Sequence, residues 1–465
     1  MDELRPDHVD DDAVEEDAPD TPIDAAVIDR LAAYGHEPEP LDEPAPVPEP
    51  VAHVVAESIQ PSEEYAVERE GSDATGLTPP LGVVEEDAVP DRRRFGRRRS
   101  RDAKPRSVEQ RKDKRAKKLV GLKIGASQIA AAQVVNNGAP ELVEVFREPL
   151  EPGVVVSGEI RDPETLGDAL KRFFELHKLP KRGVRVGLSN NRIGVRVFQI
   201  DGIADTQLEN AIRFRAEEVL PIPLDQAVLD YVVLSDEVRP DGTDSKRILL
   251  VVAYREVVDR YLQACRRAGL QVVGIDLEAF ALLRSLESPT ERDTSAGALV
   301  GVAIGHDRTT IAVSTGLYCE FARVLDWGGW SLDVAIAREL DRAPSEVEAI
   351  KRQLSFARQS EVEGLTAEQV QKARNGIQRA LATFGREIVS SLQFYQAQPG
   401  ALGIGEIVLT GGTAHMDGLT DAIGELVGVP VRLGDPFKRV KVGPQVADDA
   451  QHGSLAIAIG LGIED

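Results

Sequence analysis

The sequence has 465 residues, of which 42% are hydrophobic and 29% charged, and its formal net charge is −23. This length allows two to four folded domains of ~100 to 200 residues each, and the two lone cysteines, Cys265 and Cys319, exclude a disulfide scaffold. No apolar run approaches the roughly 18 to 20 residues of a membrane span and no secretory leader follows Met1, so we expect a cytoplasmic protein.

Residues 1–90 are predicted to form an acidic, proline-rich, disordered tail. They hold 26 Asp or Glu against three Arg, together with 13 of the 28 prolines and only two aromatic residues. Such a segment buries too little apolar surface to offset the entropy of the chain. Residues 24–35 differ, because Val27, Leu31 and Tyr34 have helical spacing. This stretch is either a docking helix or an unstructured, alanine-rich segment.

Residues 91–118 form a basic linker with 15 Lys or Arg and four acidic residues. Three partners are compatible with this charge: anionic lipid headgroups bound through residues 92–118, the acidic tail or another protein, and nucleic acid. Residues 119–465 carry a net charge of −11, which disfavours broad binding of duplex nucleic acid by the folded part.

From residue 119 onward, short apolar strands alternate with amphipathic helices, which indicates an α/β fold. We predict strands at 119–124, 128–135, 184–188, 193–200, 228–235, 247–253, 271–275, 298–304, 309–314 and 405–410. The clearest helices are predicted at 163–176, 205–219, 254–268, 277–286, 332–340, 344–354, 367–396 and 416–427. In the long helix 367–396, apolar residues at i, i+3 and i+4 form one stripe, which serves either as core packing or as a self-association face.

An internal repeat is the most informative feature of the sequence. The pattern V-G-φ-x-I-G, where φ is apolar, occurs at 120–125 and again at 300–305. Each copy is followed by polar residues and a second strand, so each predicts a hairpin with a glycine-containing tip. Backbone N–H groups at such tips approach anions closely, and two facing hairpins can hold the phosphates of one nucleotide. Near the C-terminus, strand 405–410 leads through Gly411 and Gly412 towards a helix.

This order of elements resembles the actin, hexokinase and heat-shock chaperone superfamily. A further set of motifs is more specific: F-Q-I at 198–200, L-E-N-A-I-R-F-R-A-E-E-V-L-P-I-P at 208–223, L-D-Y at 229–231, A-Y-R at 253–255, A-G-L at 268–270, Gly328-Gly329, V-E-A-I-K at 347–351, G-V-P-V at 428–431 and D-P-F at 435–437. In these motifs, over about 119–465, the sequence resembles the PilM family of type IV pilus assembly proteins.

The resemblance implies a two-lobed, actin-like (ribonuclease-H-like, duplicated) fold. It places a first lobe at 119–296 with a small inserted subdomain near 197–252, and a second lobe at 297–465. It further implies a cytoplasmic scaffold, peripheral to the inner face of the cell membrane, that docks the N-terminal cytoplasmic peptide of PilN, a bitopic inner-membrane protein. Other pilus components and a second copy of the chain are further expected partners.

ATP is the ligand that the resemblance implies. The implied nucleotide-binding residues are Gly125, Ser127 and Gln128 in the first hairpin, Gly305 and Thr309 in the second, Glu348 and Lys351 near the ribose and base, and Gly411, Gly412 and Thr413 near the adenosine.

The sequence departs from the family at the positions that serve Mg²⁺. Family members usually carry Asp directly before the Ile-Gly of each hairpin, but Lys123 and Ala303 stand there, and Ala130 replaces a lysine that commonly follows the first hairpin. Phosphoryl transfer depends on metal and positioned charges. We therefore expect a pseudo-ATPase with no catalytic residues and no metal ligands, and the alternative is an active actin-like ATPase that drives conformational cycling. His306, in the second tip, is either a surface-turn histidine or a contact for phosphate or metal. Trp327 and Trp330 are expected to pack at a lobe junction rather than to form a binding platform.

Overall fold

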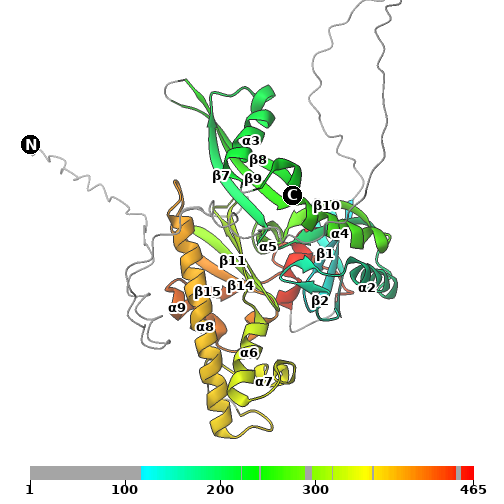
Figure 1. Cartoon of the computed structure of the whole chain (residues 1–465), viewed down its shortest axis with the longest axis vertical. Coiled ribbons are helices and arrows are strands. Elements are labelled where there is room, and N and C mark those ends of the chain that lie inside the picture. The colour runs from blue at the N-terminus through cyan, green and yellow to red at the C-terminus, as the bar shows by residue number, and fades with distance from the viewer. Residues whose placement is uncertain are drawn as a thin grey trace, which may run out of the picture. The chain divides into compact units, whose positions relative to one another are not determined.

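The computed structural model describes residues 117–220, 222–239, 242–288, 296–316, 318–358, 361–446 and 452–464 (Figure 1). The predicted acidic tail, the 24–35 helix and the basic linker up to residue 116 lie outside the described residues. Lys117 and Lys118, which we assigned to that linker, instead begin the first strand, β1 (Lys117–Ile124).

A six-stranded sheet forms the core of the first lobe, in the order β10-β6-β1-β2-β3-β16. β1, β2 and β3 form an antiparallel meander, while β6 is parallel to β1 and β10 is parallel to β6. The further strands are β2 (Gln128–Asn137), β3 (Ala139–Pro149), β6 (Arg182–Leu188), β10 (Gln271–Leu277) and β16 (Lys441–Val442). Helices α2 (Pro163–Leu176) and α4 (Arg255–Arg267) pack on this sheet and on each other.

The second lobe repeats this topology in a five-stranded sheet ordered β13-β12-β11-β14-β15. β11, β12 and β13 form an antiparallel meander, and β14 and β15 continue the sheet in parallel. The strands are β11 (Ala298–Ile304), β12 (Thr309–Ser314), β13 (Cys319–Leu325), β14 (Ile404–Thr410) and β15 (Val431–Leu433). The order β3-β2-β1-β6-β10 is thus matched strand for strand, as the predicted duplicated α/β fold requires.

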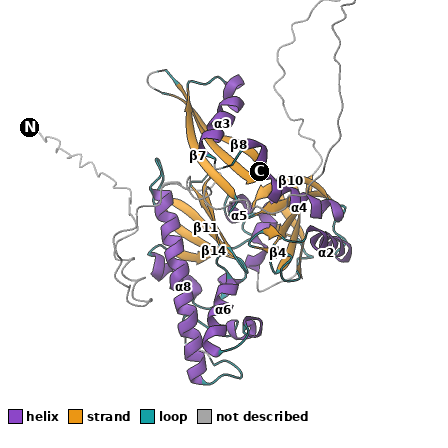
Figure 2. Cartoon of the chain, viewed as in Figure 1, coloured by secondary structure: helices purple, strands orange, loops and turns teal. Residues whose placement is uncertain are grey.

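The helices of the second lobe are α6 (Gly329–Leu340), α7 (Glu348–Lys351), α8 (Ala367–Gln396) and α9 (Leu419–Val427). Figure 2 shows the long helix α8 beside β11 and β14. The apolar stripe of α8 is buried against this sheet, so the prediction that it serves as core packing is confirmed. Trp327 lies in the same core, with its ring stacked on Phe384 at 3.9 Å, whereas Trp330 is 40% exposed. The expected lobe-junction packing therefore does not describe either tryptophan.

Each half of the sequence contributes one helix that packs against the sheet of the other half. α5 (Glu278–Leu286) follows β10 but lies against β11 and β12, and α10 (Ala456–Gly462) lies against β1 and β2. The two helices also contact each other, so closely that a Cβ on Gly460 would lie 1.8 Å from the Ala281 carbonyl oxygen. The two lobes are therefore joined by an apolar cluster in which α5 and α10 pack with β11 and β12.

A small subdomain is inserted in the first lobe and has its own apolar core. It consists of β7 (Ile193–Asp201), α3 (Asp205–Val219), the 3₁₀ turn η1 (Leu224–Gln226), β8 (Ala227–Val238) and β9 (Asp244–Tyr254). The three strands form an antiparallel sheet in the order β7-β9-β8, and α3 covers it with Leu208, Ile212 and Ala216.

Short elements account for most of the differences from the predicted secondary structure. The expected helix 344–354 is a 3₁₀ turn, η3 (Pro344–Glu346), followed by the single turn of α7. α9 starts at Leu419 and not at 416, because Gly418 at φ 75° adopts a left-handed conformation that breaks the helix. Not predicted were the hairpin β4 (Val155–Val156) and β5 (Glu159–Ile160), the 3₁₀ turns η4 (Thr413–His415) and η5 (His452–Leu455), the strands β3, β13, β15 and β16, and helix α10.

Candidate functional site

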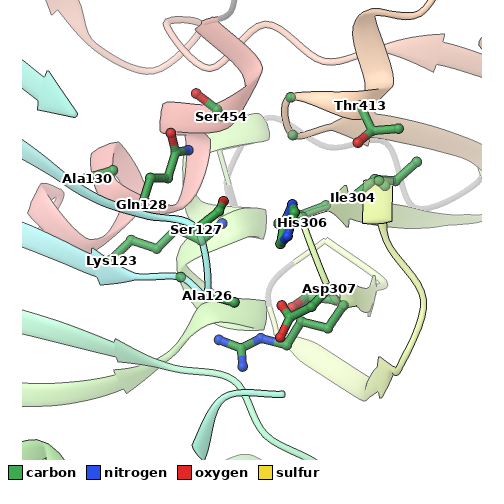
Figure 3. A pocket seen from close by; sticks show the side chains of 18 of the residues that line it. Lys123, Ala126, Ser127, Gln128, Ala130, Ile304, His306, Asp307, Thr413 and Ser454 are labelled. Atoms are coloured by element: carbon green, nitrogen blue, oxygen red, sulfur yellow. The ribbon is translucent and has the colours of Figure 1, made fainter. Parts of the chain in front are cut away.

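The two repeated hairpins end in turns of the same geometry. The Gly125 amide donates to the Gln128 carbonyl at 2.9 Å, and the Gly305 amide donates to the Arg308 carbonyl at 2.9 Å. Figure 3 shows the two tips across an open cavity, with Lys123, Ser127 and Gln128 on one side and His306 and Asp307 on the other.

A cavity of about 210 Å³ brings together residues from both lobes. Of the ten residues that the resemblance implied, nine line it: Gly125, Ser127, Gln128, Gly305, Glu348, Lys351, Gly411, Gly412 and Thr413. Thr309 does not line the cavity. Its hydroxyl is buried and donates to the Trp327 carbonyl at 2.8 Å, and the neighbouring Thr310 takes the place in the cavity wall that we expected for Thr309. The exchange follows from strand alternation, which places adjacent side chains on opposite faces.

Glycines form a wall without side chains on the second-lobe side of the cavity. Gly411 has φ 96°, and a Cβ there would lie 2.1 Å from the Ile304 carbonyl oxygen. At Gly412 a Cβ would meet no atom within 4 Å, and at Gly329 it would lie 2.6 Å from the Thr413 hydroxyl oxygen. Gly411 and Gly329 therefore allow the protein's own segments to pack closely here, whereas the backbone at Gly412 faces open space and leaves room for a ligand.

Two of the cations around the cavity are already paired. The Lys351 ammonium lies 2.6 Å from Asp333 Oδ2 and donates to the Gly329 carbonyl at 3.2 Å. Burial raises the pKa of Asp333 above its ordinary value, although the Lys351 ammonium opposes this shift. Arg352 lies 2.6 Å from Glu348 Oε1. Glu348 and Lys351, which we expected near the ribose and base, therefore each form an ion pair within the protein, Lys351 with Asp333 and Glu348 with Arg352.

The second hairpin tip is bonded to the first lobe. Asp307 Oδ2 accepts a hydrogen bond of 2.7 Å from the Ser157 amide in the β4–β5 turn, and the hydroxyls of Ser189 and Thr310 lie 3.0 Å apart. Ser157 has φ 47°, an uncommon conformation for a residue with a side chain. These bonds fix the position of the second tip relative to the first lobe.

Two charged residues of the cavity wall, Glu278 and Arg308, were not singled out from the sequence. Glu278 is 2% exposed and Arg308 is 6% exposed. Within the described residues, Glu278 Oε1 and Arg308 Nη1 have no hydrogen-bond partner. Although burial acts to lower it, the pKa of Arg308 is raised because Glu278, Tyr261 and Asp307 favour its charged form. Glu278 could have been noticed as an acid that follows a predicted strand and begins an apolar helix. The burial of Arg308 depends on the other lobe, so nothing local in the sequence signals it.

The residues of the cavity do not fit the magnesium ion that the fold implies. The positions directly before Ile124 and Ile304 hold Lys123 and Ala303, neither of which is an oxygen ligand. Within the described residues, no three His, Cys, Asp or Glu side chains come close enough to share a metal ion. Among the described helices, none has both the length and the apolarity of a membrane span.

Comparison with known proteins identifies relatives over most of the folded region. The family model for type IV pilus assembly protein PilM matches residues 121–465. The solved structure of a PilM-PilN type IV pilus biogenesis complex superposes with a TM-score of 0.61 at 26% identity, over 74% of this chain and 97% of that one. Cell division protein FtsA of Pseudomonas aeruginosa is 29% identical over 352 residues, which are 69% of this chain and 84% of its own length. FtsA of Escherichia coli K12 is 26% identical over 385 residues, which are 74% of this chain and 89% of its own length.

Proposed function

The chain belongs to the PilM family of type IV pilus assembly proteins, and on this premise we propose that it is a scaffold that docks the cytoplasmic N-terminal peptide of a PilN-like inner-membrane protein. The observation that supports this proposal is the likeness to the PilM-PilN complex, which includes 97% of that chain. On this proposal the protein works as a peripheral component at the inner face of the cell membrane.

We assign the docking site to an open groove of about 750 Å³ between the inserted subdomain and helix α4. Four acids and two arginines line it: Glu164, Asp225, Glu256, Asp259, Arg255 and Arg260. Both arginines are engaged, since Arg255 donates to the carbonyls of Asp225 and Ala227 and Arg260 bonds to Glu256 and to the Ile160 carbonyl. The carboxylates of Asp225 and Asp259 have no cationic partner within the described residues.

An acidic groove suits the proposed partner. Cytoplasmic segments next to a membrane-spanning helix carry an excess of Lys and Arg, by the positive-inside rule. Complementary charge of this kind speeds association and selects against acidic peptides. A basic N-terminal peptide is therefore the occupant that the charge of the groove favours.

Fluorescence anisotropy with the full chain tests this assignment. Labelled N-terminal peptides of candidate PilN-like proteins are expected to bind at moderate salt, and Asp259→Lys is expected to weaken binding about tenfold. The matched control is Glu425→Lys, which makes the same charge change at an exposed position of another helix, α9. If no peptide binds, the docking function is wrong. If Asp259→Lys binds as well as the control, the groove is not the site.

We also propose that the cavity between the hairpins holds ATP and does not hydrolyse it. The glycine wall and the two tips provide the contacts, and they bring both lobes to one ligand. The alternative, an active ATPase, is favoured by the buried Glu278 carboxylate in the cavity wall, whose Oε1 makes no hydrogen bond within the described residues. Phosphate release by the full chain above the background of a Glu278→Gln variant would support the ATPase, and equal release would support the scaffold.

The basic segment 92–118 remains a proposed contact for anionic lipid, and it lies largely outside the described residues. Self-association of the chain is likewise a proposal. Neither is required by the docking of the peptide.

A further inference from the structure

We propose that the Lys123 ammonium takes the place of a divalent cation in this cavity, so that the protein binds the phosphates of a nucleotide without metal. This inference rests on the proposed nucleotide site, and it adds which residue neutralises the phosphate charge. Lys123 is the residue directly before the Ile124-Gly125 pair that leads into the first hairpin tip, and it lines the cavity.

The position of Lys123 on its strand directs the side chain away from the core. Its neighbours Leu122 and Ile124 are fully buried in the first lobe, and residues that alternate along a strand face opposite sides. Opposite Lys123 in the β1–β2 register is Ala130, a small residue that also lines the cavity. Figure 3 shows Lys123 on the same side of the cavity as Ser127 and Gln128.

Among the described residues that line the cavity, Lys123 is the cation that lacks a matching acid. Lys351 is paired with Asp333, and Arg352 is paired with Glu348. In the part of the chain that the structure describes, the Lys123 ammonium makes no ion pair and no hydrogen bond with the protein. An ammonium is strongly attracted to phosphate oxygens, to which it can donate three hydrogen bonds.

The remaining acids of the cavity do not neutralise Lys123. Asp307 accepts a hydrogen bond from the Ser157 amide, on the side of the first lobe. Glu278 acts electrostatically on the buried guanidinium of Arg308 and helps to keep it charged. A nucleotide would therefore meet one unmatched positive charge beside the first tip.

A lysine and a metal ion have different chemical consequences. Mg²⁺ bridges phosphate oxygens and stabilises the charge that develops during phosphoryl transfer, whereas an ammonium supplies one positive charge and hydrogen bonds. The replacement retains the attraction for phosphate but removes the bridging of the transferring group. Binding without hydrolysis is the behaviour that this arrangement favours.

Titration of the full chain with a fluorescent ATP analogue, in excess EDTA and separately in excess Mg²⁺, tests the inference. For wild type, the dissociation constants in EDTA and in Mg²⁺ are expected to agree within about twofold, because the cation is part of the protein. Lys123→Met is expected to bind at least about tenfold more weakly in EDTA, since a charge-assisted contact is lost. Lys123→Asp is expected to bind only when Mg²⁺ is present.

The matched control is Lys118→Met, at an exposed position on the same strand but outside the cavity, and it should bind as wild type does. Circular dichroism checks that each variant is folded. If wild type binds the ATP analogue only with Mg²⁺, the inference about Lys123 is wrong but the nucleotide site is supported. If Glu278→Gln then loses this Mg²⁺-dependent binding, Glu278 is assigned as the metal ligand. Unchanged binding by Lys123→Met would also overturn the inference about Lys123. No binding in either condition would overturn the nucleotide site itself.

Discussion

The two copies of V-G-φ-x-I-G form the same turn but differ in the residue before the Ile-Gly pair and in the bonds that their tips make. Both tips close with an amide-to-carbonyl bond of 2.9 Å. The first copy has an unmatched lysine, Lys123, before its tip, whereas the second has the nearly buried Ala303. The second tip is bonded to the opposite lobe through Asp307, and no side chain of the first tip makes an equivalent bond among the described residues.

The two hairpins therefore share backbone geometry but differ in the charges and contacts around their tips. The first hairpin supplies charge to the cavity, and the second fixes the relation between the lobes. The glycines of the two motifs differ in the same way. Gly121 lies under the backbone of α10, and Gly301 lies under leucine side chains of α5.

The largest expected effect comes from adding a methyl group at the first of these glycines. In Gly121→Ala the Cβ would lie 2.0 Å from the Ala458 carbonyl oxygen and 2.6 Å from the Gly462 nitrogen, so α10 must move. We expect a loss of about 3 kcal/mol or more in the free energy of unfolding, measured by urea denaturation.

The same substitution in the second copy is its control. In Gly301→Ala the nearest atoms are flexible Leu282 carbons at 3.2 and 3.3 Å, and we expect a loss of about 1 kcal/mol or less. Equal losses in the two variants would contradict the view that the helices pack differently on the two copies.

A moderate effect is expected from breaking the bond between the second tip and the first lobe. Asp307→Ala removes the acceptor of the Ser157 amide, and we expect a loss of about 1–3 kcal/mol together with faster amide exchange in 155–160. Asp326→Ala is the control, because this exposed acid follows β13 and has no partner within the described residues. Unchanged exchange in Asp307→Ala would show that the bond does not hold the tip.

The smallest effect concerns pH and the segment that leads into α10. The Gly453 amide donates to His415 Nε2 at 3.3 Å, and burial, with a smaller contribution from His452, lowers the pKa of His415 below its ordinary value of 6.5. The folded state therefore favours neutral His415. Its contribution to stability is present above pH 6.5 and is lost as the pH falls through 6.5 towards the lowered pKa.

His415→Gln tests this contribution through the unfolding temperature. At pH above 6.5 the variant should unfold about 1–2 °C below wild type, and this difference should shrink as the pH is lowered. A difference that stays constant with pH would show that His415 does not titrate between the folded and unfolded states.

Elements with strong local signals were predictable from the sequence. Helix α2 has the predicted bounds because Asp162 caps it, accepting from the amides of Glu164 and Thr165, and Pro163 begins it. β11 is buried along its whole length and reads as a continuous apolar run. β3 and β13 were missed because charged residues interrupt the apolar pattern of each strand, among them Glu144 and Arg147 in β3 and Glu320 and Arg323 in β13.

The cavity was partly predictable because the repeated motif marks both tips. The burial of Arg308 and the orphaned carboxylate of Glu278 depend on segments that are distant in sequence, and no local pattern reveals such contacts. The packing of α10 on the opposite sheet is of the same kind. The apolar residues of α10 could be read from the sequence, but the sequence did not indicate that they pack on β1 and β2.

A crystal structure of the full chain with ATP in excess EDTA tests the central claim most directly. We expect the triphosphate between the two tips, with Lys123 Nζ within hydrogen-bond distance of a phosphate oxygen and no metal ion. A nucleotide bound elsewhere, or bound between the tips only when Mg²⁺ is restored, would contradict this claim.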